Sequence, residues 1–183
     1  MRSARTLLAT IAAIGVAILG LLLRRHGAMP EVPGAPSFES RFTVRASLEA
    51  VARFHSDPSA LKQLTPTPMQ VHRMDPMAEG SVSEFTMWVG PVPIRWQAMH
   101  SALDGLVGFT DTQERGPMAR WVHRHEFTSL GPALTEVSDR IWYRHPPRWR
   151  GVLTRLVFST LPLRVLFRYR AWATRRALRQ AGR

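Results

Sequence analysis

Two histidines separated by a single residue are the groups in this chain best suited to do chemistry. His123 and His125 lie in the segment WVHRHEF at residues 121–127. An imidazole exchanges protons near neutral pH and also binds metal ions. Alternate side chains of a strand share a face. If this segment is a strand, both imidazoles therefore point the same way, alongside aromatic neighbours.

Acidic and amide side chains have matching parity in the neighbouring segments. Asp139 shares a face with Tyr143 in one predicted strand, and Asp111 shares a face with Gln113 in another. A plain sheet core more often carries Val, Ile and Leu at such positions, so we predict a lined pocket. The predicted ligand-binding residues are Phe85, Met87, Trp96, Phe109, Asp111, Gln113, Trp121, His123, His125, Phe127, Asp139 and Tyr143.

Three roles are open to this polar group. The side chains could satisfy one another in the core, orient a ligand in an apolar pocket, or perform acid–base chemistry with His123, His125 and Asp139 as the catalytic candidates. Two imidazoles and Asp111 or Asp139 could also bind a metal ion. A lone His-x-His pattern is weak, and we predict no metal. No nucleophile is identifiable, so ligand orientation is favoured over catalysis.

The elements that must position these residues form an α+β order. Hydrophobic periodicity and Gly/Pro turns predict a strand, two short helices, six further strands and a long C-terminal helix. Short connections indicate antiparallel hairpins. We expect Ser47 to cap the first helix and Pro162 to kink the last. The expected ranges are 38–44, 47–56, 59–64, 69–74, 81–89, 94–103, 108–114, 119–128, 134–143 and 151–180.

Together with that order, four short motifs resemble the START/Bet v 1-like (SRPBCC) superfamily. They are F-x-D-x-Q at 109–113, G-P at 116–117, W-x-H-x-H-x-F at 121–127 and D-x-x-x-Y at 139–143. The likeness spans about residues 37–180 and is nearest to bacterial polyketide cyclase/dehydrase-type and ligand-binding members. It implies a helix-grip fold, in which a curved antiparallel sheet wraps a long C-terminal helix around a cavity for a hydrophobic ligand. Members include carriers, receptors and cyclases, so the fold alone does not choose the function.

Composition excludes some functions. The chain has 183 residues and no cysteine, which rules out disulfides and thiolate chemistry. The net charge of +12 comes almost wholly from arginine. On the C-terminal helix these arginines indicate a solvated face or a membrane-surface role. We predict no nucleic-acid partner, because no recognised motif accompanies the charge. We also predict no cofactor, because no phosphate-cradling loop is present.

The N-terminal part has the composition of a membrane anchor. Residues 6–23 form a run of 18 residues without a charge. This length is near the lower limit for a helix that spans a bilayer. We assign 1–25 to the anchor, 26–36 to a Pro/Gly tether and 37–183 to the ligand-binding domain. The chain is thus expected to be a single-pass membrane protein. Basic residues flank the apolar run on both sides and nearly balance, with the domain expected to be cytoplasmic.

Two functions remain open from the sequence. The favoured one is a membrane-anchored protein that binds or transfers a hydrophobic small molecule or lipid. The alternative is a polyketide cyclase/dehydrase-like enzyme that uses the cavity histidines as acid and base. The sequence does not specify the ligand or the oligomeric state.

Overall fold

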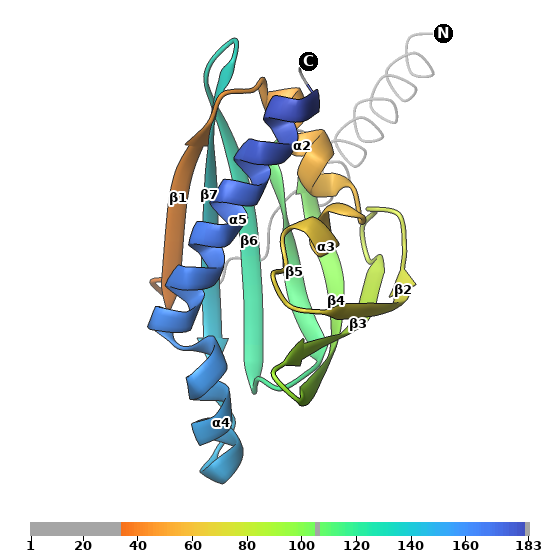
Figure 1. Ribbon diagram of the computed structural model, residues 1–183, viewed down its shortest axis with the longest axis vertical. Helices are drawn as coiled ribbons and strands as arrows, with labels where there is room; N and C mark the ends of the chain where they lie inside the picture. The colour runs from red at the N-terminus through yellow and green to blue at the C-terminus, as the bar shows by residue number, and fades with distance from the viewer. Residues whose placement is uncertain (1–33, 105–106, 182–183) are drawn as a thin grey trace, which may run out of the picture. The chain divides into compact units, whose positions relative to one another are not determined.

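A single antiparallel sheet of seven strands forms the framework of the fold (Figure 1). The computed structural model describes residues 34–104 and 107–181, with β1 beside β7 and the other strands following in hairpin order, β7-β6-β5-β4-β3-β2. The strands are β1 Phe38–Val44, β2 Met69–Met74, β3 Val82–Val89, β4 Val92–Asp104, β5 Gly108–Arg115, β6 Arg120–Gly131 and β7 Leu134–Arg144. The predicted antiparallel meander is confirmed.

The two short helices follow from their local sequence. In α2, Leu48–Ser56, the Ser47 hydroxyl accepts a hydrogen bond from the Ala50 amide at 3.3 Å, which satisfies one of the unpaired donors at the helix start. Asp57-Pro58 then ends the helix, because proline disfavours a helical conformation in the residue before it. A single turn follows as α3, Ala60–Gln63.

The C-terminal helix differs from the prediction at its break. It consists of α4, Arg148–Phe158, and α5, Thr160–Ala181. The chain leaves helical geometry at Ser159, where ψ is 175°, and not at Pro162. Proline lacks an amide hydrogen, and the first turn of a helix has no acceptor for one. Pro162 is therefore accommodated in the first turn of α5 and does not kink it.

The helices cover one face of the sheet (Figure 1). The inner side of α5 presents Leu163, Phe167 and Ala171, all buried. Phe167 packs against Phe38 of β1 with ring centroids 5.2 Å apart, and Ala173 of α5 joins α3 in a separate apolar cluster. The helix-grip arrangement expected from the resemblance is thus confirmed.

The predicted membrane anchor, residues 6–23, and most of the predicted tether lie outside the described residues. Across residues 34–104 and 107–181, none of the helices combines the length and apolar character needed to cross a bilayer.

Candidate functional site

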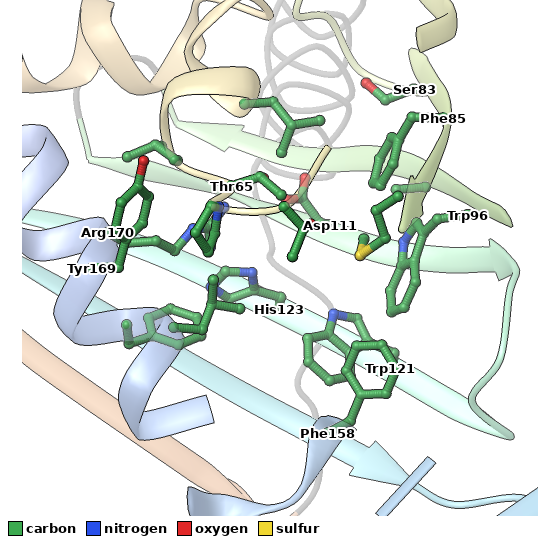
Figure 2. A pocket seen from close by; sticks show the side chains of 18 of the residues that line it. Thr65, Ser83, Phe85, Trp96, Asp111, Trp121, His123, Phe158, Tyr169 and Arg170 are labelled. Carbon is green, nitrogen blue, oxygen red and sulfur yellow. The ribbon is translucent and has the colours of Figure 1, made fainter. Parts of the chain in front are cut away.

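A cavity of about 710 Å³ lies between the sheet and the helices. Its walls come from β3 to β6, from the segment between α2 and β2, and from the junction of α4 and α5. One end is aromatic, with Trp96, Trp121 and Phe158 in mutual contact (Figure 2). Most of the lining is apolar, and the volume is in the range of small-molecule sites.

A continuous chain of polar side chains, which we call the His–Asp chain, runs across the strands at one side of this cavity. Its first half joins β3, β4 and β5. The Ser83 hydroxyl lies 2.8 Å from His100 Nε2, and His100 Nδ1 donates to Asp111 Oδ1 at 2.5 Å. Asp111 therefore receives a donor from the strand on one side of it.

The second half joins β5, β6 and β7. His125 Nε2 donates to Asp111 Oδ2 at 3.2 Å, and His123 Nε2 donates to Asp139 Oδ1 at 2.9 Å. His125 Nδ1 is also 2.9 Å from Asp139 Oδ1, but the N–H does not point at that oxygen. This last contact is ionic and not a well-formed hydrogen bond. His125 thus sits between two carboxylates.

Strand register explains why these groups meet. Asp111 is directly opposite both His100 and His123, and His125 is directly opposite Asp139. Opposite residues on neighbouring antiparallel strands bring their side chains close on one face. The His–Asp chain is therefore a property of the sheet pairing and not of a flexible loop.

The pKa values of the groups in the His–Asp chain are shifted in different directions. Burial alone would lower the pKa of His125, but the hydrogen bonds and charges of Asp111 and Asp139 outweigh it and raise that pKa. Burial, assisted by the neighbouring His125, lowers the pKa of His123 to about 4. Burial opposes ionisation of both aspartates, yet their histidine donors hold the pKa of each below its ordinary value. His125 therefore holds a proton more readily than His123 does.

Two further groups complete the polar side of the cavity. Arg170 of α5 reaches into it, and Figure 2 shows this side chain and His123 both directed inward. His55 of α2 lines it as well, with its Nδ1 3.0 Å from the Val51 carbonyl oxygen. The arginines of the C-terminal helix were predicted to form a solvated face or a membrane-surface face, and both alternatives are wrong for Arg170, which lines the cavity.

Eight of the twelve predicted ligand-binding residues line the cavity, and four do not. Gln113 instead holds the turn before β6, since its side chain bonds to both backbone groups of Met118. Phe127 packs on Phe109, and Tyr143 stacks on Trp121. Asp139 lies behind the two histidines that it orients. The residues that line the cavity are Phe85, Met87, Trp96, Phe109, Asp111, Trp121, His123 and His125.

Sequence reasoning missed Ser83, His100 and Arg170. Strand parity could have identified Ser83 and His100, because residues an even number apart in a strand share a face. His100 shares a face with Trp96, and Ser83 shares one with Phe85. Helical spacing could have identified Arg170, which lies seven residues after the buried Leu163. Seven residues are close to two helical turns, so the two side chains lie on the same side of α5.

Asp111, His123 and His125 are the residues that could hold a metal ion. One ligand atom from each lies within 4.8 Å of the others. The donor set suits zinc or iron. Asp111 and His125 are already hydrogen-bonded to each other through His125 Nε2, so a metal ion bound at that nitrogen would require this hydrogen bond to open.

Comparison with known proteins identifies the fold through structural similarity. No protein-family model and no curated protein sequence matches the chain significantly. Solved structures do match across most of it. The Zhui aromatase/cyclase from a Streptomyces species superimposes with a TM-score of 0.63 and 14% identity, covering 80% of this chain and 94% of that one.

Two further structures have the same architecture. A START superfamily protein from Mycobacterium smegmatis gives a TM-score of 0.57 at 15% identity, over 79% of this chain and 97% of its own. A norcoclaurine synthase from Thalictrum flavum gives a TM-score of 0.60 at 14% identity, over 80% of this chain and 95% of its own. The chain therefore has the START/Bet v 1-like fold that its motifs resemble.

Proposed function

We propose that the protein binds or transfers a hydrophobic small molecule or lipid in its internal cavity while anchored to a membrane through residues 6–23. The observation that carries this proposal is the cavity itself, about 710 Å³ in volume and lined mostly by apolar and aromatic side chains. Burial of apolar ligand surface in such a site is favourable. An apolar N-terminal segment would keep the cavity close to a supply of lipophilic ligands.

The His–Asp chain favours recognition over chemistry in this proposal. Asp111 accepts hydrogen bonds from His100 and His125. Asp139 accepts one from His123 and has an ionic contact with His125. A buried network of this kind fixes its side chains in place. It would thus act as a rigid polar wall against which one end of a ligand is aligned.

Identification of a co-purifying molecule tests this function. Full-length protein would be analysed by native mass spectrometry, and any bound molecule would be extracted and identified. We expect an apolar or amphipathic compound in stoichiometric amount. Empty protein that is also not stabilised against heat by lipids or quinones would contradict the proposal.

A cyclase/dehydrase-like enzyme is the second candidate, favoured by the two histidines whose rings line the cavity. His125 is held between carboxylates, and such contacts orient an imidazole for proton transfer. Similarity to the aromatase/cyclase is one of fold only. If this function holds, replacing His123 and His125 by Ala should abolish turnover while ligand binding persists. Unchanged turnover would reject it.

A further inference from the structure

Arg170 places a positive charge in the cavity wall without an acidic partner. It lies on α5 three residues after Phe167, and its guanidinium carbon is 5.2 Å from the centre of the Phe167 ring. Among the described residues, none forms a hydrogen bond or ion pair with Arg170. A guanidinium carries five donors in a rigid fork, and here those donors face the cavity.

The nearby aspartates do not satisfy this group. Asp111 and Asp139 attract Arg170 at a distance, yet burial still lowers the pKa of the guanidinium. Both carboxylates are already hydrogen-bonded to histidines, and His125 lies between the two of them. Burial of an unpaired charge is unfavourable, so a ligand that supplied the missing partner would gain affinity.

Taking ligand binding by the cavity as its premise, we propose that Arg170 binds the oxyanion of an amphipathic ligand, either a carboxylate or a phosphate. The apolar part of that ligand would lie toward Trp96, Trp121 and Phe158. Arginine recognises both oxyanions by parallel hydrogen bonds. The cavity would thus select amphiphiles with a negative head over neutral ones of equal length.

Matched amphiphiles test the proposal. Decanoic acid, decanol and decyl phosphate would be titrated calorimetrically into full-length protein in lipid nanodiscs, with empty nanodiscs as the blank. Hydrogen bonds to a charged group are strong enough to give a preference of about tenfold or more for an anionic head. Decanoic acid and decyl phosphate then distinguish a carboxylate from a phosphate ligand.

Variants assign the preference to one side chain. Arg170→Gln should bind the acid and the alcohol equally, and Arg170→Lys should retain part of the preference. Arg179→Gln, an exposed arginine on the same helix, should behave as wild type. Equal affinity of wild type for anionic and neutral probes would overturn the role of Arg170 while leaving the proposed function intact. Binding of none of the probes would instead count against the proposed function.

A separate observation concerns the outer surface of α4 and α5. Trp149, Val152, Leu153 and Leu156 follow one another at spacings of three, one and three residues, which places them on one side of α4. All four are exposed, Leu156 by 70%. Leu161 and Val165 of α5 are exposed as well. We call these six residues the outer apolar face, and it is the reverse of the usual pattern, in which the apolar side of a helix is buried.

Arginines accompany the outer apolar face. Arg148, Arg150 and Arg155 are exposed on α4, and Arg164 and Arg168 are exposed on α5. No acidic residue occurs from 148 to the last residue, 183. A second copy of this surface would bring like charges together, whereas an anionic lipid surface complements both the charge and the apolar side chains.

We infer that the outer apolar face inserts into the interfacial layer of an anionic membrane. Leu156, Leu161 and Val165 also line the cavity, so this contact would put the α4–α5 side of the cavity against the lipid. The inference depends on exposure and charge, and it holds whether or not a ligand is transferred.

Site-specific labels test the contact in the full chain. The protein has no cysteine, so single variants Leu161→Cys and Leu153→Cys can each carry an environment-sensitive fluorophore. Leu130→Cys, 52% exposed at the end of β6, is the matched control. In vesicles of phosphatidylcholine and phosphatidylglycerol we expect quenching by spin-labelled lipids at 153 and 161 and not at 130. Quenching should weaken in pure phosphatidylcholine.

Charge-removing variants and a vesicle-free measurement complete the test. Replacing Arg155, Arg164 and Arg168 by Gln should reduce quenching at 161 several-fold. Absence of quenching at 161 in anionic vesicles would overturn the inference. So would a label at 161 that is already shielded without vesicles, because a second copy or the chain's own apolar segment at 6–23 would then cover the face.

Discussion

His125 is the residue that contacts both carboxylates of the His–Asp chain. It lies between Asp111 and Asp139 and stacks on Phe109 with centroids 4.3 Å apart. His125→Phe keeps a ring of similar size but removes both ring nitrogens, which contact the two carboxylates. Two buried carboxylates would then lose a partner, and we expect the free energy of unfolding to fall by about 3–5 kcal/mol.

Chemical denaturation of both proteins would measure this loss. His72→Phe is the control, because His72 is exposed on β2 and surface changes alter stability by about 0.5 kcal/mol or less. A loss below about 1 kcal/mol for His125→Phe would show that the carboxylates are not held by His125.

His55 should make stability depend on pH. Burial lowers its pKa to about 4, against about 6.5 in an unfolded chain. Between these values the unfolded chain binds more protons, so stability falls as pH falls from 6.5 towards 4. The groups that face His55 are Phe54, Phe127, His125, Asp139 and Arg170.

His55→Phe should remove its share of that loss. Between about pH 6.5 and pH 4.5, wild type should lose on the order of 2 kcal/mol more than the variant. Thermal unfolding followed by circular dichroism at both pH values gives the comparison. Parallel losses in the two proteins would mean that His55 is protonated without cost.

At the scale of elements, the pairing of β5 with β6 positions the His–Asp chain. Gly108 begins β5 with φ of 146°, and a Cβ there would collide with the carbonyl oxygen of His125. Gly108→Ala must therefore displace the backbone of His125. We expect a loss of at least about 1–3 kcal/mol together with weakened ligand binding.

A second glycine serves as the control for this substitution. Gly131 has a similar φ of 159°, but open space surrounds the position of its Cβ. Gly131→Ala should therefore be better tolerated in a thermal unfolding assay. Equal losses at both positions would attribute the effect to backbone conformation and not to the contact with His125.

Local patterns were sufficient to predict most of the elements. Alternation and Gly/Pro turns placed all seven strands to within about three residues, because antiparallel hairpins are specified by short-range sequence. The break at Ser159 was not predicted, because the sequence there has no strong helix-breaking residue except Pro162, which a first turn tolerates.

The site was harder to predict than the elements. Parity predicted that His123 and His125 point to one face, since that depends on one strand only. The position of Asp139 behind them depends on the pairing of β6 with β7, and the inward direction of Arg170 depends on how α5 packs. Both features depend on tertiary packing. From its charge alone, Arg170 was expected to be exposed to solvent.

At the scale of the whole molecule, two membrane contacts are proposed, and they differ in strength. A spanning segment at residues 6–23 would resist extraction by alkaline carbonate, whereas a helix that lies in the interface is released. We expect the full chain to remain in the membrane pellet after carbonate treatment. Ile14→Arg would place a charge at the centre of the segment, which disfavours insertion by about 2.5–3.5 kcal/mol.

The two contacts should therefore separate in a single pair of measurements. Ile14→Arg protein should become extractable by carbonate yet still sediment with anionic vesicles at low salt, because the outer apolar face and its arginines remain. Adding Leu156→Glu and Leu161→Glu should remove the residual binding. Ala13→Ser, a small polar change beside Ile14, should stay in the pellet. Extraction of the wild-type chain would contradict the anchor, and loss of vesicle binding with Ile14→Arg alone would leave residues 6–23 as the principal contact with the membrane.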